Sequence, residues 1–345
     1  MSRDPRIEWS EDRDAKVVEM RLETEGWARS MRLDRYLCRR FPKLSRTRVQ
    51  KIIRTTLTVN GHPARKAGTT LHVGDVVVIR RPLKVEPETP RDVRVLADFG
   101  TFMAIDKPAG LPVHPAGRYY RNTVTTILKE RYGSDPKFVV AHRIDRETSG
   151  VLLVCRDKTV ERTLKQMFQD RRVRKTYLAI VRGVMVEPGQ IDLPLGQVEG
   201  SRIHVKMHVT EDGAPAVTDF FPIRSWDEYS LVDVRPRTGR QHQIRAHMAA
   251  IGHPIVGDKM YGVPEDWFFE FLESGMTGPL LERLDLSRQA LHAARLELAH
   301  PETGRPLVVE APFWDDMTEF LDRLGPPLWE AEATDGIIDA RRTGR

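Results

Sequence analysis

Short apolar runs of β-strand character dominate residues 94–325, and this feature most constrains the fold. They read TFMAI, GVLLVC, KTYLAIV, YSLVDV, RLELAH and PLVVEA. Helical periodicity is found in a few segments between them, such as 158–170 and 241–252. Crossover helices are therefore too few for a doubly wound parallel sheet. The sequence predicts an α+β fold with a largely antiparallel, mixed sheet.

A small and very basic segment precedes this region. Residues 31–82 hold thirteen Lys and Arg against two acids, Asp34 and Asp75, whereas the whole chain has a net charge of only +6. We expect one helix from Arg32, a second after Ser45 as its N-cap, short strands around an NG turn, and a strand pair around a GD turn. Such local charge is typical of a surface that binds RNA phosphates, and a merely solvated face is the alternative.

The order of motifs in this segment resembles the S4-type RNA-binding domain. The resemblance covers residues 31–82 and rests on RLDRYLCRRFPKLSRTRVQKIIRTTLTVNG followed by GDVVVI. It implies a small α/β domain that binds structured RNA through exposed cations. The residues expected to contact RNA are Arg32, Arg35, Lys43, Arg46, Arg48, Lys51, Arg54, Arg65 and Lys66.

The local composition of the chain predicts the boundaries of its domains. Residues 1–26 are acid-rich and lack a clear period, so we expect a flexible leader before an RNA-binding domain at 27–83. The prolines of PLKVEPETPRDV indicate a linker at 84–93, which leads into the strand-rich domain at 94–325. Residues 326–345 mix proline, glycine and charge and are expected to form a loose tail.

One acid of the strand-rich region is placed unusually. Asp145, in the stretch AHRIDRETSGVLLVC, lies between Arg143 and Arg146. A Thr-Ser-Gly turn leads from it into an apolar strand, so we expect the carboxylate on a loop held by a rigid scaffold, where reactive groups are often found. Neighbouring arginines would keep it ionised and could reach RNA phosphate. A surface salt bridge is the alternative, and these residues alone identify no reaction.

The same stretch resembles the catalytic motif of the RluA-type pseudouridine synthases, in which HRLD is followed by two residues, TSG and an apolar strand. Four further blocks match in order: DKPAGLPVHP (106–115), RKTYLAIVRG (174–183), RTGRQHQIRAHMAAIGHPIVGDKMYG (237–262) and QALHAARLELAHPETG (289–304). The resemblance spans nearly all of 94–325 and implies the catalytic domain of that family. An S4-type domain in front is its common companion.

Site residues follow from the resemblance. It implies that Asp145 is the essential aspartate, Tyr177 the active-site tyrosine and Arg245 the basic residue paired with the aspartate. The carboxylate either attacks covalently or removes a sugar proton to give a glycal, and both routes stay open. The target base has to leave its stack, and Arg143 is implied to fill the vacated position, with His142 beside it as a further RNA contact. Without the resemblance, Tyr177 would be a half-buried strand aromatic and Arg245 a helix-surface cation.

We expect neither a cofactor nor a metal. The sequence has no P-loop and no GxGxxG motif, and the spacing of His242, His247 and His253 fits no zinc motif. Two distant cysteines, Cys38 and Cys155, and the lack of an apolar leader or a membrane-length run favour a cytoplasmic protein.

The sequence therefore predicts an RNA pseudouridine synthase that acts on large-subunit ribosomal RNA or on ribosome assembly intermediates, and a monomer is favoured. Two alternatives stay open: a synthase directed to transfer RNA, and a non-catalytic RNA-binding or ribosome-assembly factor with the same two domains. The joint presence of Asp145, Tyr177 and Arg245 argues against a pure binding protein, which has no need of this trio.

Overall fold

The computed structural model describes residues 7–12, 17–42, 44–82, 86–115, 119, 121–133, 138–197 and 200–331. The chain divides into two compact units, Met1–Val85 and Glu86–Arg345, and the division lies inside the segment expected to be a linker. Across the described ranges, every helix is too short or too polar to cross a membrane.

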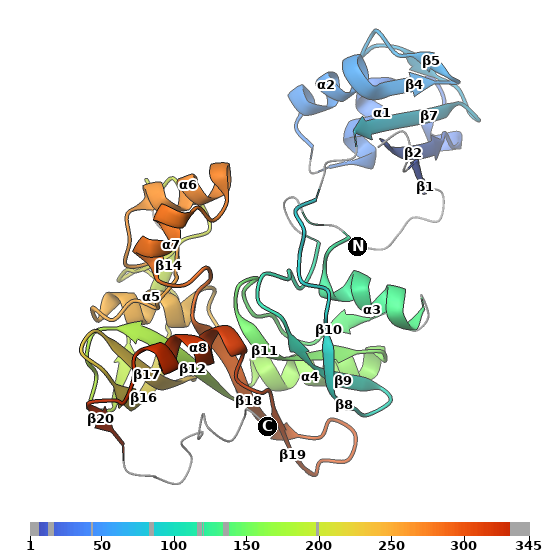
Figure 1. Ribbon diagram of the computed structural model, residues 1–345. Helices are drawn as coiled ribbons and strands as arrows, with labels where there is room; N and C mark the ends of the chain where they lie inside the picture. Colours follow the sequence, from blue (N-terminus) through green and yellow to red (C-terminus); the bar gives the residue numbers. More distant parts are fainter. Residues whose placement is uncertain are drawn as a thin grey trace. The chain divides into compact units, whose positions relative to one another are not determined.

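The N-terminal unit contains a five-stranded antiparallel sheet with the strand order β1-β2-β7-β4-β5, and a separate ribbon of β3 and β6 (Figure 1). Its elements are β1 (Ile7–Asp12), β2 (Val17–Glu23), a 3-10 turn (Gly26–Ala28), β3 (Met31–Arg32), α1 (Leu33–Arg40), α2 (Arg46–Thr56), β4 (Leu57–Val59), β5 (His62–Pro63), β6 (Thr70–Leu71) and β7 (Val76–Pro82).

The two helices of this unit form as the sequence predicts. Ser45 is the N-cap of α2, because its Oγ accepts a hydrogen bond from the amide of Arg48 at 3.3 Å. Helix α1 buries Leu37 and α2 buries Ile53 in one core with Leu22 of the sheet. The basic side chains on the opposite helix faces are left to solvent.

Two expectations for this unit are wrong. The supposed flexible leader contains β1 and β2, and β2 pairs with β7 so that Met20 lies opposite Ile79 and is buried. Alternating apolar and charged residues from Glu19 to Glu23 explain this strand, because one face can enter the core while the other stays in water. The strands around the GD turn do not pair with each other, since β6 pairs with β3 and β7 pairs with β2 and β4.

The larger unit is built on one eleven-stranded sheet. Its main path is β13-β16-β17-β12-β18-β11-β9-β8, with β10 beside β11, β19 beside β18 and β20 beside β16, while β14 and β15 form a separate pair. Among the strand pairs of the described residues, β11 with β18 alone is parallel. The prediction of an α+β fold with a largely antiparallel, mixed sheet is confirmed.

The elements of this unit follow one another as β8 (Arg94–Asp98), β9 (Phe102–Lys107), α3 (Val124–Tyr132), β10 (Val139–Val140), β11 (Ser149–Cys155), α4 (Lys158–Gln169), β12 (Arg174–Arg182), β13 (Gly189–Asp192), β14 (Leu195–Gln197), β15 (Met207–Val209), β16 (Val217–Ser225), β17 (Tyr229–Pro236), α5 (Gln243–Ala250), α6 (Glu265–Ser274), α7 (Gly278–Leu284), β18 (Leu291–Ala299), β19 (Pro306–Glu310), α8 (Asp315–Arg323) and β20 (Trp329–Glu330).

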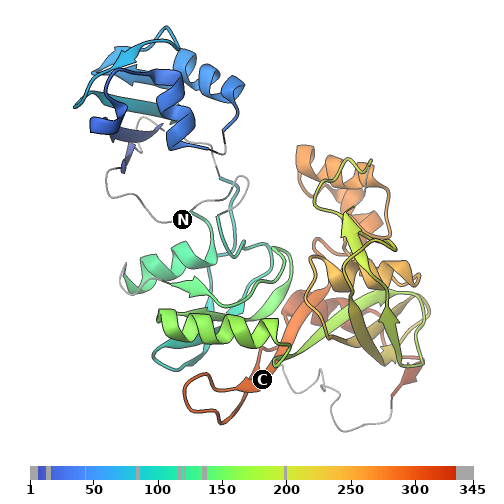
Figure 2. The same cartoon turned by 180° about the vertical axis from the view of Figure 1, so that it is seen from behind.

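Helices α3 and α4 cover opposite faces of one half of this sheet. Successive residues of β9 alternate between two cores: Met103 and Ile105 pack with α3, whereas Phe102 and Ala104 pack with α4. In Figure 1 α4 lies behind the sheet, and in Figure 2 it lies in front. Burial on both faces makes this half a rigid support for the loops at its edge.

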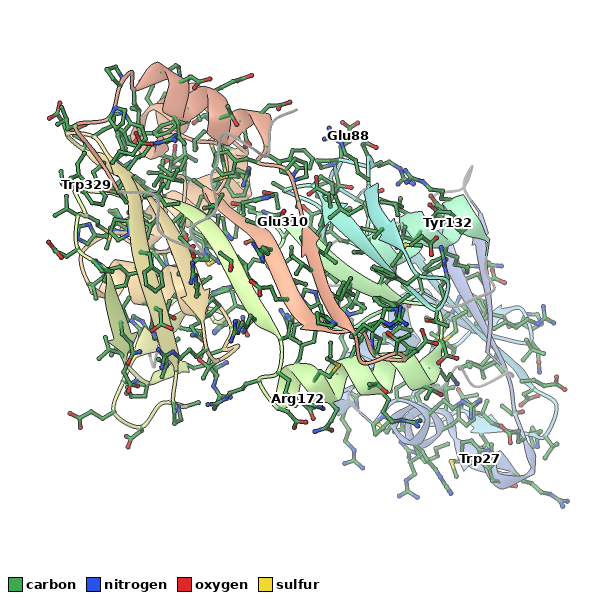
Figure 3. All side chains as sticks on the ribbon, turned by 90° about the horizontal axis from the view of Figure 1, so that it is seen from below. Trp27, Glu88, Tyr132, Arg172, Glu310 and Trp329 are labelled. Atoms are coloured by element: carbon green, nitrogen blue, oxygen red, sulfur yellow. The ribbon has the colours of Figure 1, made fainter. Side chains whose placement is uncertain are left out.

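The other half of the sheet packs against α5 and α8, which contribute residues such as Met248 and Phe320 to its core. The chain after α8 is still part of this half: Trp329 of β20, labelled in Figure 3, pairs with Ser225. The loose tail expected from residue 326 is therefore wrong for residues 328–330, and residues 332–345 lie outside the described ranges.

Candidate active site

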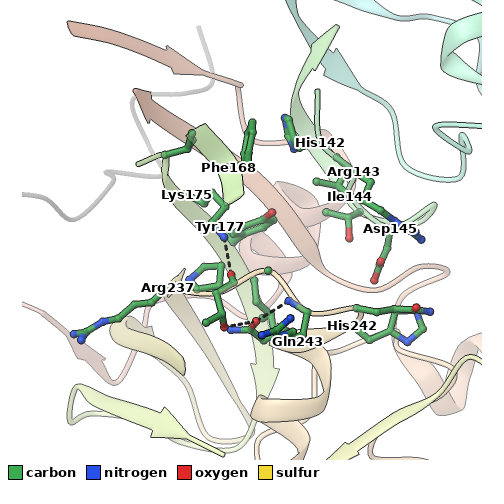
Figure 4. Close-up of a pocket in the computed structure, with 18 of the residues that line it drawn as sticks. His142, Arg143, Ile144, Asp145, Phe168, Lys175, Tyr177, Arg237, His242 and Gln243 are labelled. Carbon is green, nitrogen blue, oxygen red and sulfur yellow. Dashed lines mark hydrogen bonds between the residues drawn. The ribbon is translucent and has the colours of Figure 1, made fainter. Parts of the chain in front are cut away.

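A cavity of about 730 Å³ opens where four segments of the larger unit meet (Figure 4). Its walls come from the loop before β11, the end of α4, the start of β12, and the segment that leads into α5. Asp145, Tyr177 and Arg245 come from three different sequence blocks, and all three line this cavity. Its volume is in the range of sites that enclose a small molecule.

A buried lysine fixes the loop that carries Asp145. At the end of β9, Nζ of Lys107 donates to the backbone carbonyls of Pro108 at 2.7 Å, Leu111 at 2.9 Å and Arg146 at 2.9 Å. These three carbonyls replace the water that a buried ammonium group loses. The residue after Asp145 is thereby tied to β9, which also pairs with β11 at the other end of the loop.

Strand β18 places the Asp145 loop and Tyr177 relative to each other. Gly150 of β11 lies opposite Ala293 in the parallel pair, and Tyr177 of β12 lies opposite the same Ala293 in the antiparallel pair. Gly150 has a φ of +106°, and a Cβ on it would lie 2.3 Å from the carbonyl oxygen of Ala293. Glycine is required here because any side chain would push the two strands apart.

Arg245 of α5 joins two carboxylates. Its Nη1 donates to Oδ2 of Asp145 at 3.0 Å, while Nε and Nη2 donate to the two oxygens of Asp258 at 2.6 and 2.8 Å. The side chains of Arg245 and Asp258 are 6% and 0% exposed, whereas that of Asp145 is 24% exposed. Arg245 is thus a buried residue and not a helix-surface cation. Asp258 orients the guanidinium so that it holds Asp145 at the cavity wall.

The sequence analysis missed Asp258. It follows Gly257, whose φ is +75° and where a Cβ would lie 1.9 Å from the carbonyl oxygen of Arg288. Oδ1 of Asp258 also accepts hydrogen bonds from the amides of Met260 at 2.8 Å and Tyr261 at 3.2 Å. The sequence signal for such a residue is an acid directly after a turn glycine, where a short carboxylate can bind nearby amides.

The ion pair of Asp145 and Arg245 is charged at neutral pH. Burial by itself raises the pKa of Asp145, but Arg245, together with a hydrogen bond from Gln289, holds that pKa below its usual value. Burial also disfavours the charged form of Arg245, yet Asp258 and Asp145 raise the pKa of this guanidinium. The result is an ionised carboxylate that is partly exposed to the cavity.

Tyr177 lies on the cavity wall between Asp145 and Lys175 (Figure 4). Its ring packs against two hydrophobic cores of this unit. Burial, and after it the negative charge of Asp145, raise the pKa of the Tyr177 hydroxyl. The hydroxyl therefore keeps its proton at neutral pH and can act as a hydrogen-bond donor.

His242 lines the cavity and, like Asp258, was not predicted for the site. It precedes α5 with a φ of +55°, a left-handed conformation that is uncommon for residues other than glycine. The Tyr261 hydroxyl accepts a hydrogen bond from the amide of Met207 at 2.8 Å and lies within hydrogen-bond distance, 3.0 Å, of Nδ1 of His242. Burial, and after it Arg245, lower the pKa of His242 to about 4, so the ring is neutral at neutral pH.

Arg143 and His142 have different surroundings. Arg143 is exposed at the cavity and, within the described part of the chain, has neither a hydrogen bond nor an ion pair, so it is not a partner of Asp145. The ring of His142 stacks on Phe168 with 4.4 Å between centroids, and its Nε2 accepts from the amide of Leu153 at 3.1 Å. Burial lowers the pKa of His142 to about 3. His142 is thus a neutral part of the wall, and its contact with RNA stays a prediction.

The other histidines near α5 contact protein groups. His247 lies within 2.9 Å of both the Thr218 hydroxyl and the Leu193 carbonyl, and Nδ1 of His253 lies 2.9 Å from the Arg182 carbonyl. In the ranges that the structure describes, no group of His, Cys, Asp or Glu is arranged to hold a metal ion.

Comparison with known proteins gives the family. The sequence profile of the RNA pseudouridylate synthase family matches residues 101–250. An uncharacterized RNA pseudouridine synthase of Chloroflexus aurantiacus is 35% identical over 301 residues, which cover 85% of this chain and 90% of the relative. Ribosomal large subunit pseudouridine synthase D of Xanthomonas campestris is 35% identical over 305 residues, which cover 86% of this chain and 90% of the relative. The chain belongs to the RluA-type RNA pseudouridine synthase family.

Two solved structures support this assignment of an RNA pseudouridine synthase, which is an isomerase. Human RNA pseudouridylate synthase domain containing 1 has a TM-score of 0.56 and 26% identity, and the match covers 73% of this chain and 95% of the human chain. Human RNA pseudouridylate synthase domain containing 4 has a TM-score of 0.51 and 25% identity, with 67% and 92% covered. The predicted family is confirmed.

The pseudouridine synthase also carries the predicted S4 domain, whose profile matches residues 31–77. Arg32 forms an ion pair with Asp34 at 2.8 Å, and Lys43 lies outside the described residues. The side chains of the other expected RNA contacts are exposed, as is that of Arg32; they are Arg35, Arg46, Arg48, Lys51, Arg54, Arg65 and Lys66. Their contact with RNA stays a prediction.

Proposed function

We propose that this pseudouridine synthase modifies uridines of large-subunit ribosomal RNA with Asp145 as its catalytic carboxylate, assisted by Tyr177 and Arg245, and without a cofactor. The observation that supports the proposal most strongly is the buried Arg245, which is bound on one side by Asp258 and on the other by Asp145. A protein that only binds RNA has no need for an ionised carboxylate held at a cavity wall by a desolvated cation.

The reaction can be balanced with the groups in the cavity. The bond between C1′ and N1 of the target uridine breaks, the uracil turns, and a bond forms between C1′ and C5. N1 gains a proton and C5 loses one, so the overall composition is unchanged and no oxidant, reductant or group carrier is needed. Asp145 either attacks covalently or removes a sugar proton, and both routes start from the ionised form that Arg245 favours.

Two further side chains are suited to hold the turning uracil. The Tyr177 ring gives the base an aromatic surface on which to stack, and its protonated hydroxyl is a donor for a uracil oxygen. In the tautomer whose Nδ1 accepts the proton of the Tyr261 hydroxyl, His242 offers Nε2–H as a second donor. Both donors are neutral, so they can bind the base without weakening the ion pair of Asp145.

The base has to reach the cavity from a folded RNA, which requires that it leaves its stack. Arg143 has no protein partner among the described residues and lies at the cavity beside Asp145. Its planar guanidinium can occupy the vacated position or bind the displaced strand. The exposed cations of the S4 domain would add phosphate contacts elsewhere on the RNA.

The choice of large-subunit ribosomal RNA, mature or in an assembly intermediate, rests on relatives. Proteins named ribosomal large subunit pseudouridine synthase D in Xanthomonas campestris, Pasteurella multocida and Vibrio cholerae are 35%, 32% and 31% identical to this chain. A target in transfer RNA and a purely binding function are the alternatives to be tested. The cytoplasmic location stays a prediction.

The test is to map pseudouridine in all RNA of cells that lack this protein, after complementation with wild type or with Asp145→Asn. We expect sites in large-subunit ribosomal RNA to disappear in the deletion, to return with wild type and to stay absent with Asp145→Asn. Asp227→Asn, at an exposed position outside the cavity, is the matched control and should restore them. RNA binding by the purified Asp145→Asn protein should persist, because the carboxylate serves chemistry and not affinity.

The possible outcomes separate the alternatives. Loss of sites only in transfer RNA would replace the proposed target and leave the enzyme assignment in place. Wild-type levels of pseudouridine with Asp145→Asn would falsify the role of Asp145. An unchanged map in the deletion, together with purified protein that modifies no RNA, would favour the binding factor.

A further inference from the structure

The cavity is much more cationic than its chemistry requires. Asp145 is the carboxylate among the lining residues of the cavity. The lining cations are Arg143, Lys165, Arg171, Lys175, Arg237, Arg240 and Arg245. A single ionised carboxylate needs one such partner, and Arg245 already fills this role.

Only some of these cations have a carboxylate partner in the described part of the chain. Arg237 pairs with Asp219 at 2.6 Å, and Lys165 pairs with Glu161. Four others, Arg143, Arg171, Lys175 and Arg240, have no carboxylate partner in the described ranges. Nζ of Lys175 donates to the Thr238 carbonyl at 2.6 Å, Nε of Arg240 donates to the Pro215 carbonyl at 3.2 Å, and the guanidinium of Arg171 has no hydrogen bond to a described residue.

Lys175 lies at the end of the cavity away from Asp145, whereas Arg143 lies beside Asp145. Figure 4 shows Lys175 and Arg237 toward one end, Asp145 and His242 toward the other, and Tyr177 between them. Arg171 belongs to the turn that leads into β12, the strand of Lys175, and a Cβ on Gly239, the residue before Arg240, would lie 3.8 Å from Nζ of Lys175. Burial, followed by the charge of Arg171, lowers the pKa of Lys175 to about 8.

The backbone holds this cluster in place. Arg171 has a φ of +58° in the turn after α4, and its amide donates to the Phe168 carbonyl at 3.2 Å. Lys175 belongs to β12, the strand that also carries Tyr177, and alternation along the strand points both side chains to the same face. Lys175 is thus presented by a strand of the central sheet, Arg171 by a hydrogen-bonded turn, and Arg240 by a segment whose amide donates to Oε1 of Gln243 at 3.0 Å.

We propose that Arg171, Lys175 and Arg240 form a subsite for a backbone phosphate of the RNA, next to the nucleotide whose base enters at Tyr177. This inference rests on the proposed function and specifies how its substrate is held. A phosphate would accept hydrogen bonds from all three side chains and offset their mutual repulsion. A cavity that takes a base at one end and a phosphate at the other requires a splayed single strand, because the backbone of a regular duplex cannot enter it.

The test uses full-length protein and a transcript of large-subunit ribosomal RNA. The variants are Arg171→Gln, Lys175→Gln, Arg240→Gln and the triple substitution, and glutamine can still donate to the Thr238 carbonyl. Arg172→Gln is the matched control, because Arg172 is the next residue, is exposed, pairs with Asp170 at 3.1 Å and does not line the cavity (Figure 3). The measurements are the salt dependence of RNA affinity and the single-turnover rate as a function of RNA concentration.

We expect each subsite variant to lower the slope of log affinity against log salt by about 0.7, as for the loss of one phosphate contact on a single strand. The RNA concentration at half-maximal rate should rise about tenfold for the triple variant. The rate constant at saturation should change less than about twofold, because the lost phosphate contact stabilises the bound ground state and the transition state equally. Arg172→Gln should change neither quantity. A salt slope equal to that of wild type in all three single variants would overturn the subsite.

A modified RNA identifies the contacted group. When the phosphate beside the target uridine is replaced by a neutral methylphosphonate, Arg171→Gln should no longer weaken binding, because the two changes remove the same contact. If the affinity losses caused by Arg171→Gln and by the methylphosphonate are additive at every linkage around the target, the cluster does not bind a phosphate there. Wild-type protein that binds the transcript but never modifies it would refute the proposed function alone, since both binding measurements would still test the subsite.

Discussion

The charged side chains at the two ends of the cavity differ in whether they have partners within the protein. At one end, Asp145, Arg245 and Asp258 form a nearly buried chain in which each charge has a partner. At the other end, Arg171, Lys175 and Arg240 have no carboxylate partner among the described residues. The first end is complete before RNA arrives, whereas the second acquires its counter-charge from the ligand. The difference separates a group prepared for chemistry from groups prepared for binding.

This contrast has an energetic counterpart. A buried charge that loses its partner keeps its desolvation cost, so breaking a buried pair is expensive for the fold. A cation without a carboxylate partner forms no ion pair that a substitution could break, and its removal leaves no uncompensated charge behind. Substitutions at the two ends should therefore differ in stability as well as in activity.

Asp258→Asn should have the largest effect, because it leaves Arg245 with the single carboxylate of Asp145. We expect the free energy of unfolding to fall by about 3–5 kcal/mol, as for other broken buried pairs. Asp266→Asn is the control, since the ion pair of Asp266 with Arg202 is exposed and should contribute at most about 1 kcal/mol. Denaturant unfolding measures both. Equal losses in the two variants would mean that the paired end is not desolvated in solution.

Lys175→Gln, at the cationic end, should have a much smaller effect on stability. It removes a partly buried ammonium group that Arg171 repels and keeps a donor for the Thr238 carbonyl. We expect a free energy of unfolding no more than about 0.5 kcal/mol below that of wild type at neutral pH. The same denaturant series measures it. A loss as large as that of Asp258→Asn would remove the distinction between the two ends.

The smallest effect is expected from pH. Since its pKa is below the usual value, Asp145 stays ionised, and His242 stays neutral with a pKa of about 4. The single-turnover rate constant at saturating RNA should therefore be flat between about pH 5 and pH 7.5, where an ordinary histidine would titrate. Lys175 behaves differently, because it loses its proton as the pH rises through about 8, and RNA affinity should fall there. A drop of the rate constant near pH 6.5 would assign catalysis to a group outside this pair.

Much of the site could be predicted because the sequence motifs mark it. Asp145, Tyr177 and Arg245 come from three separate blocks, and the structure brings them to one cavity. The antiparallel character of the large sheet followed from the number of short apolar runs and the scarcity of crossover helices. The strand pattern is local in sequence and can be read without knowledge of the fold, whereas the roles of Tyr177 and Arg245 were predicted only through the family resemblance of their blocks.

What could not be predicted depends on contacts between distant segments. Asp258 acts through Arg245, and Nδ1 of His242 contacts the hydroxyl of the distant Tyr261, so neither role can be read from a single stretch of sequence. The first two strands were missed for another reason: their many acids resemble a disordered segment, although alternation along β2 indicates a strand. In this segment the alternation along β2 is a better guide to structure than the acid-rich composition.

The register of β18 has a consequence for motion. Because Gly150 and Tyr177 flank the same residue, Ala293, a displacement of this strand moves both neighbouring backbones in the same direction. Thermal fluctuations of the sheet then carry the carboxylate loop and the aromatic ring together, and their separation varies less than the position of either one. The distance between the Asp145 loop and the Tyr177 ring can then stay nearly constant while the sheet that carries them fluctuates.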